Sequence, residues 1–166
     1  MRKKILICVF LIVGCSTIAL AQNKPFWLRQ IESDIEQDKL NLRIRDQNYR
    51  SEGESIFLYV VFLKIKDATA GMVQIDKYKN LENPKERFKF SVERFSLSSA
   101  KNIPKTELKN VGDEGYIWTY TNGAATIMFR KGEIFINVFA PSEKISGVAS
   151  EELAKTLAQY VDKNLP

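Results

Sequence analysis

The fold of this chain is decided by residues 115–140, which read GYIWTYTNGAATIMFRKGEIFINVFA. Apolar and β-branched residues form three short runs in it, at 115–121, 124–130 and 133–140. Asn122-Gly123 separates the first two runs and is the strongest two-residue hairpin signal, because both central positions of a type I′ turn need positive φ. Lys131-Gly132 separates the second and third. The segment predicts a three-stranded antiparallel meander.

A helix is expected after the meander. Pro141 closes the last strand, and Ser150 is a suitable N-cap. Leu153, Leu157 and Val161 then recur at helical spacing, which predicts a stripe that packs on the sheet.

The chain before the meander mixes helical and strand patterns. Apolar residues recur at helical spacing first and then alternate with polar ones. The expected elements are a helix at 26–38, a half-buried strand at 40–45, a loop at 46–55, a central strand covered on both faces at 56–63 and its hairpin partner at 72–79.

Residues 84–97 fit two structures. Asn83-Pro84 is a helix start signal, whereas the apolar residues over 88–92 also alternate as in a strand. We predict a helix on the strength of the start signal. Phe90 and Leu97 would then lie opposite the apolar stripe that enters the core, so a second apolar side would have to meet something else.

The predicted fold class is α+β. It consists of an antiparallel sheet of about five to six strands, including the C-terminal meander, with N-terminal, middle and C-terminal helices packed on it. A long surface loop at 98–112 joins the middle helix to the meander. No repeat or linker divides residues 22–166, which are expected to form a single domain.

Residues 1–21 predict an export signal. Three basic residues precede an apolar run that is too short for a comfortable membrane span, and Ala19 and Ala21 suit a signal peptidase. Cleavage before Gln22 would release a periplasmic or extracellular protein. A second reading takes Ile12–Cys15 as a lipobox, which would make the product a lipoprotein anchored to the membrane at Cys15.

Loss of the signal peptide removes Cys8 and Cys15, the only cysteines, from a chain that has no histidine. Disulfides, Cys nucleophiles, Ser-His-Asp triads, and zinc or haem sites built on His or Cys are thereby excluded. We predict no catalytic residue, cofactor or metal site.

The charge of the exported part argues against nucleic acid as a partner. The formal net charge of +5 falls to +2 when the three basic residues of the signal leave, because 22 Lys and Arg then face 20 Asp and Glu. Residues 64–110 hold eleven basic against six acidic residues. This excess is either a solvated face or a patch for anionic lipid, polysaccharide or an acidic partner.

The segment VGDEGY at 111–116, followed by FRKG at 129–132, resembles a pattern of small exported bacterial proteins of unknown function. In those proteins a GDE-A/G-Y segment opens a meander, an R-K/R-G turn joins its last strands and a C-terminal helix follows. The resemblance covers the last third of the chain. It implies an exported α+β domain and carries over no catalytic residue.

Three functions remain open. The leading one is a non-catalytic exported domain that binds an unknown envelope macromolecule through a patch around Phe90, Leu97 and Lys101. The second is a carrier of a small apolar ligand in a pocket beneath the aromatic residues. The third is a hydrolase that uses two carboxylates about 5 to 9 Å apart. Asp113 and Glu114 are poor candidates for it, because adjacent side chains of a strand point to opposite faces. We expect turn chemistry at Asp113 and a solvated Glu114.

The N-terminal fate can be read by labelling producing cells with a radioactive fatty acid. We expect an unlabelled protein that begins at Gln22, and no change in the Cys15→Ala variant. A label that disappears in Cys15→Ala would establish the lipoprotein instead.

Overall fold

The computed structural model describes residues 24–40, 42–52, 55–65, 68–78 and 82–166. The expected signal peptide at 1–21, both expected cleavage sites and Cys15 lie outside these ranges. None of the helices described is long and apolar enough to cross a membrane.

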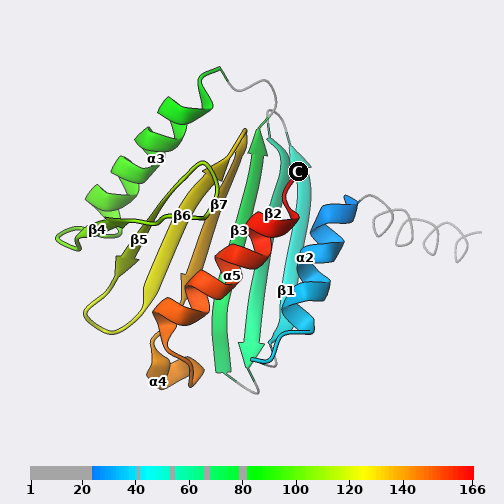
Figure 1. Ribbon diagram of the computed structural model, residues 1–166, viewed down its shortest axis with the longest axis vertical. Helices are drawn as coiled ribbons and strands as arrows, with labels where there is room; N and C mark the ends of the chain where they lie inside the picture. Colours follow the sequence, from blue (N-terminus) through cyan, green and yellow to red (C-terminus); the bar gives the residue numbers. More distant parts are fainter. Residues whose placement is uncertain (1–23, 41, 53–54, 66–67, 79–81) are drawn as a thin grey trace, which may run out of the picture.

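Seven strands of the described chain form one sheet, and all neighbouring strands run antiparallel. Their order across the sheet is β1-β2-β3-β7-β6-β5-β4 (Figure 1). The strands are β1 (Arg43–Glu52), β2 (Ser55–Ile65), β3 (Ala68–Tyr78), β4 (Lys105–Glu107), β5 (Glu114–Thr119), β6 (Ala125–Lys131) and β7 (Ile134–Ala140). The predicted α+β class and the C-terminal meander are confirmed, in a sheet wider than expected.

Two segments that were expected to be loops are strands: one lengthens β1, and the other adds a seventh strand to the sheet. Residues 46–52 belong to β1 rather than to a loop, and Lys105–Glu107 forms β4 inside the expected loop at 98–112. Both are edge strands, since β1 pairs with β2 alone and β4 with β5 alone. Backbone hydrogen bonds to a neighbour hold such strands whatever their side chains, and polar side chains suit an edge because they discourage pairing with another chain.

The strand predicted to be central in the sheet, at residues 56–63, does not lie at its centre. β2, which contains residues 56–63, lies second from one edge, and β7 of the meander occupies the middle of the sheet. Strand position is set by pairing partners far along the chain, which local hydropathy does not encode. The prediction that both faces of this strand are covered falls on side chains that the structure does not describe.

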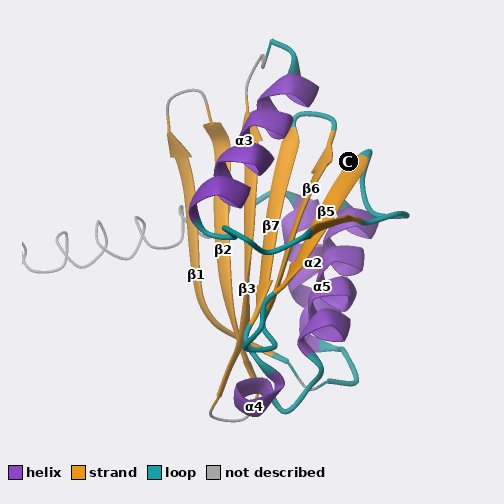
Figure 2. Cartoon of the chain, turned by 90° about the vertical axis from the view of Figure 1, so that its left-hand side faces the viewer, coloured by secondary structure: helices purple, strands orange, loops and turns teal. Residues whose placement is uncertain are grey.

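Helices cover both faces of the sheet (Figure 2). α2 (Phe26–Glu36) and α5 (Ser150–Asn164) lie side by side on one face, and α3 (Pro84–Ser98) lies on the other. The short α4 (Glu143–Ser146) follows β7. The predicted N-terminal, middle and C-terminal helices are all present.

The meander supplies side chains to two separate cores, because successive residues of a strand point to opposite faces. On β5, Ile117 joins the core under α2 and α5, whereas Tyr116 and Trp118 face α3. On β7, Ile136 and Phe135 divide in the same way. A strand buried on both faces must be covered by helices on both, which accounts for the layer order.

The predicted N-cap at Ser150 and the predicted turn at Asn122-Gly123 both adopt a different local structure. Ser150 is the first residue of α5 rather than its N-cap, and its buried hydroxyl donates to the carbonyl oxygen of Pro141 at 2.5 Å. The Asn122-Gly123 turn is not type I′, since only Gly123 has positive φ; its N–H donates to the Tyr120 carbonyl at 2.8 Å. A longer loop of type I character with glycine in the left-handed position is the common alternative.

Arg130 joins the segment at 111–116 to the turn at 129–132. Its guanidinium binds Asp113 at 2.8 Å and Glu114 at 3.0 Å, and the Asp113 carboxylate also accepts the N–H of Gly132 at 2.9 Å. The expectation of a solvated Glu114 is therefore wrong. Asp113 precedes β5, so the two carboxylates are not consecutive strand residues and can reach one guanidinium.

Gly112 is required where the chain enters β5. Its φ is +62°, and an added Cβ would lie 2.4 Å from the carbonyl oxygen of Arg130. Gly132 also has positive φ, at +56°, but an added Cβ would meet nothing within 4 Å. Substituting each glycine by alanine therefore separates two costs: both substitutions place a Cβ at positive φ, but only the one at Gly112 also creates a steric clash.

We expect Gly132→Ala to lower the free energy of unfolding by about 1–2 kcal/mol, the cost of a left-handed residue with a Cβ. Gly112→Ala should lower it by about 1–3 kcal/mol more, because the carbonyl of Arg130 must also move. Urea denaturation measures both. Equal losses would show that the close approach at Gly112 does not exist.

Candidate functional site

α3 is attached to the sheet along one side. Phe88 and Val92 are buried, and the ring of Phe88 lies 5.4 Å from that of Phe135 while Phe95 lies 4.9 Å from Trp118 in edge-to-face contacts. These rings fill the space beneath the helix. Phe88, Phe95, Trp118 and Phe135 thus form a packed core, where a ligand pocket was the alternative hypothesis, and grooves lie at the two sides of α3.

The outward side of α3 carries apolar side chains. Phe90 is 57% exposed and Leu97 is 77% exposed, and Lys101 follows the helix on the surface. The helix at 84–97 is confirmed, and it places Phe90 and Leu97 away from the core stripe. Asn83 is the N-cap but makes no side-chain capping bond, so Pro84 and the packing of the apolar stripe define the helix start.

One groove runs along the side of α3 that faces β6. We call it the arginine groove; its volume is about 290 Å3. The residues that line it are Arg87, Phe90, Ser91, Arg94, Phe95, Ser98 and Met128. Its rim is basic, and its base is apolar.

A second groove of about 450 Å3 lies on the other side of α3, where the chain leaves the helix. It has both an acid, Glu93, and a base, Lys105, whose ammonium lies 4.3 Å from the centre of the Tyr116 ring. The hydroxyl of Ser96 is buried here without a hydrogen-bond partner among the described residues. Charges of both signs and a cation already placed on a ring give this groove no clear ligand preference.

Polar side chains lie on the α3 face of the sheet at its centre. Gln74 and Asp76 of β3 share a hydrogen bond of 2.9 Å, and Gln74 pairs in register with Asn137 of β7. Burial raises the pKa of Asp76 to about 6, and the bond from Gln74 opposes the rise. Asp76 is therefore a carboxyl group that titrates near neutral pH.

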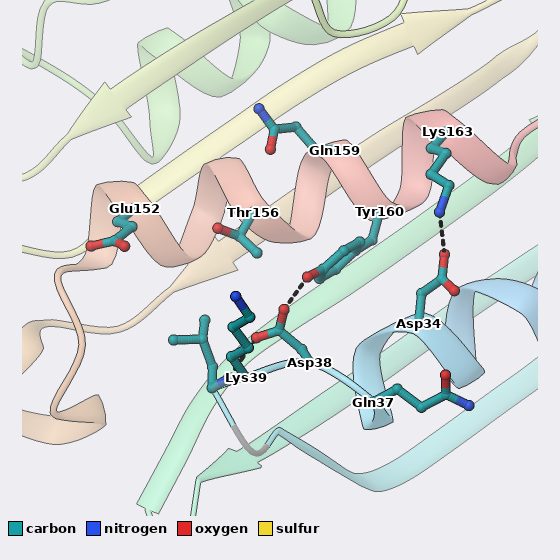
Figure 3. Close-up of a pocket in the computed structure, with 10 residues that line it drawn as sticks. Asp34, Gln37, Asp38, Lys39, Glu152, Thr156, Gln159, Tyr160 and Lys163 are labelled. Carbon is teal, nitrogen blue, oxygen red and sulfur yellow. Dashed lines mark hydrogen bonds and ion pairs between the residues drawn. The ribbon is translucent and has the colours of Figure 1, made fainter.

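A third groove, with a volume of about 590 Å3, lies between α2 and α5 (Figure 3). Figure 3 shows Tyr160 pointing at Asp38 and Lys163 at Asp34 across this groove. The bond from the Tyr160 hydroxyl to Asp38 raises the pKa of Tyr160 to about 12. Three acidic residues, Asp34, Asp38 and Glu152, line this groove, and a hydrolase that uses two carboxylates would need such a group.

Both aspartates are occupied by contacts that join the helices. Asp38 also accepts the N–H of Leu40 at 2.7 Å, and Asp34 accepts from the amide of Asn164 at 2.7 Å. The bond from Asn164 lowers the pKa of Asp34. A general acid needs a raised pKa, so Asp34 does not suit proton transfer. Both aspartates instead hold α5 against α2. The described residues include no group of three ligands that could hold a metal ion.

The sequence did not reveal the arginine groove or the polar side chains of Gln74, Asp76 and Asn137 on the α3 face of the sheet. The signal for the groove was present, because Arg87, Ser91, Arg94 and Ser98 recur at helical spacing beside the apolar stripe. For Asp76 the sequence predicted only a place on a strand at 72–79, in alternation with apolar residues. That side of the strand could not be distinguished from a solvated one without knowing that α3 folds back over this face.

No family model, curated protein or solved structure matches this chain. The assignment of function therefore rests on the geometry of these surfaces.

Asp76 predicts a pH dependence of stability. A raised pKa means that the folded state binds the proton more tightly than the unfolded state, so Asp76 stabilises the fold below about pH 4 and this contribution is lost as pH rises through 6. We expect Asp76→Asn to gain about 2 kcal/mol relative to wild type between pH 4 and pH 7. Urea denaturation at both pH values measures the difference. The exposed Glu82→Gln serves as the control, and an Asp76→Asn profile parallel to wild type would contradict the shift.

Proposed function

We propose that this chain is a non-catalytic exported domain that docks onto another protein of the bacterial cell envelope through the outward side of α3. The observation that carries the proposal is the exposure of Phe90 and Leu97, at 57% and 77%, on a helix whose opposite side is fully used by the core. Burying each of these side chains in a partner contributes about 1.5–3 kcal/mol. Two such side chains on one helix can serve as the apolar anchors of a larger contact.

The charges around these two anchors favour a protein over a bilayer or a polyanion. Exposed Glu86 and Glu93 lie on the same side of α3 as Phe90 and Leu97, and Lys101 follows them. An anionic lipid surface or an acidic polysaccharide would repel the two glutamates. A central apolar contact within a rim of both charges is typical of protein interfaces.

Four acids that could have formed catalytic pairs hold the fold together instead. Asp113 and Glu114 hold Arg130, and Asp34 and Asp38 hold α5. Removal of the signal peptide leaves no Cys or His to replace them. We therefore propose binding to a partner and not catalysis.

A photo-crosslinking residue in place of Leu97 tests the contact in producing cells. We expect one saturable crosslinked protein from position 97, and its loss when Phe90→Ser is added. Position 145 is the matched control, because Ile145 is 54% exposed on α4, away from α3. The same product from position 145, no product at all, or a product made only of two copies of this chain would contradict the proposal.

A further inference from the structure

The arginine groove has a uniform rim. Arg87, Ser91, Arg94 and Ser98 follow one another at intervals of three or four residues, so they line one side of α3. No carboxylate lines this groove, whereas the groove beside Lys105 contains Glu93 and the groove between α2 and α5 contains three acids. An anion would therefore meet no like charge among its lining residues.

The two guanidinium groups of the groove are available for binding. Neither Arg87 nor Arg94 forms an ion pair or a side-chain hydrogen bond with the described residues. They are two helical turns apart, about 10 Å along the axis. Guanidinium groups bind carboxylate and phosphate oxygens through paired N–H donors, which makes them well suited to an acidic head group.

The base of the groove is apolar and supported by the core. Phe95 is held edge-to-face on Trp118, and the half-buried Met128 of β6 packs against the same core. The flexible thioether of Met128 can adapt to an apolar chain. The groove of about 290 Å3 has room for roughly ten non-hydrogen atoms.

From these observations we propose that the arginine groove binds a small amphipathic anion, with its carboxylate or phosphate between Arg87 and Arg94 and a short apolar chain on Phe95 and Met128. This ligand site does not rest on the protein contact proposed above: Phe90 borders both surfaces, but the head group and the chain are held by Arg87, Arg94, Phe95 and Met128.

Octanoate is a probe of the right size, and isothermal titration calorimetry of the purified exported domain measures its binding. We expect Arg87→Gln and Arg94→Gln each to weaken binding by about tenfold, since each removes a charge-assisted bond. Lys89→Gln is the matched control: it removes the same charge from an exposed position of α3 outside the groove, and should change nothing. Ser91→Phe keeps both arginines but fills the groove, and should abolish binding.

Three further ligands separate the sources of affinity. Octyltrimethylammonium, with the opposite charge, and inorganic phosphate, without a chain, should both fail to bind. Vesicles of anionic phospholipid should bind no better than neutral ones. Equal losses in Lys89→Gln and Arg87→Gln, undiminished binding by Ser91→Phe, binding of either small control ligand, or binding to anionic vesicles without binding of octanoate would each overturn the proposal. Circular dichroism of every variant establishes that it is folded.

Discussion

The requirement that β5, β6 and β7 be buried on both faces shapes the rest of the molecule. Residues such as Ile117 and Trp118 are neighbours in sequence but enter different cores. Each core needs a helical cover, because apolar surface left in water costs about 25 cal/mol per Å2. Among the described helices, α2 and α5 share one face of the sheet, while α3 lies on the other. A single helix over that face leaves both of its flanks as grooves and its outer side open to a partner.

The remaining contacts fix how these layers join. Arg130 secures the entry to β5 against the turn between β6 and β7, and the bonds from Tyr160 to Asp38 and from Asn164 to Asp34 join α5 to α2. The polar residues most suggestive of chemistry in the sequence are thus structural. In contrast, Arg87 and Arg94 form no ion pair with the described residues and Phe90 and Leu97 are exposed, which is why both proposals are placed on them.

α3 offers two adjacent surfaces. The outer side presents Phe90 and Leu97, and the arginine groove lies next to it with Phe90 at the boundary. Phe90 lines the groove, so the two proposed surfaces share this side chain. The raised pKa of Asp76 adds a group on the same face of the sheet that responds to mild acid.

The sequence by itself determined the α+β class, the meander, the three main helices and the exposed position of Phe90 and Leu97, because hydrophobic periodicity and start signals are local properties. It did not determine the edge strands β1 and β4, the central place of β7 or the partners of Asp113 and Glu114, which depend on pairing between distant segments. The arginine groove was also decided by tertiary structure. A row of arginines and serines on one side of a helix looks like a solvated surface until the sheet beneath it supplies Met128 and a wall.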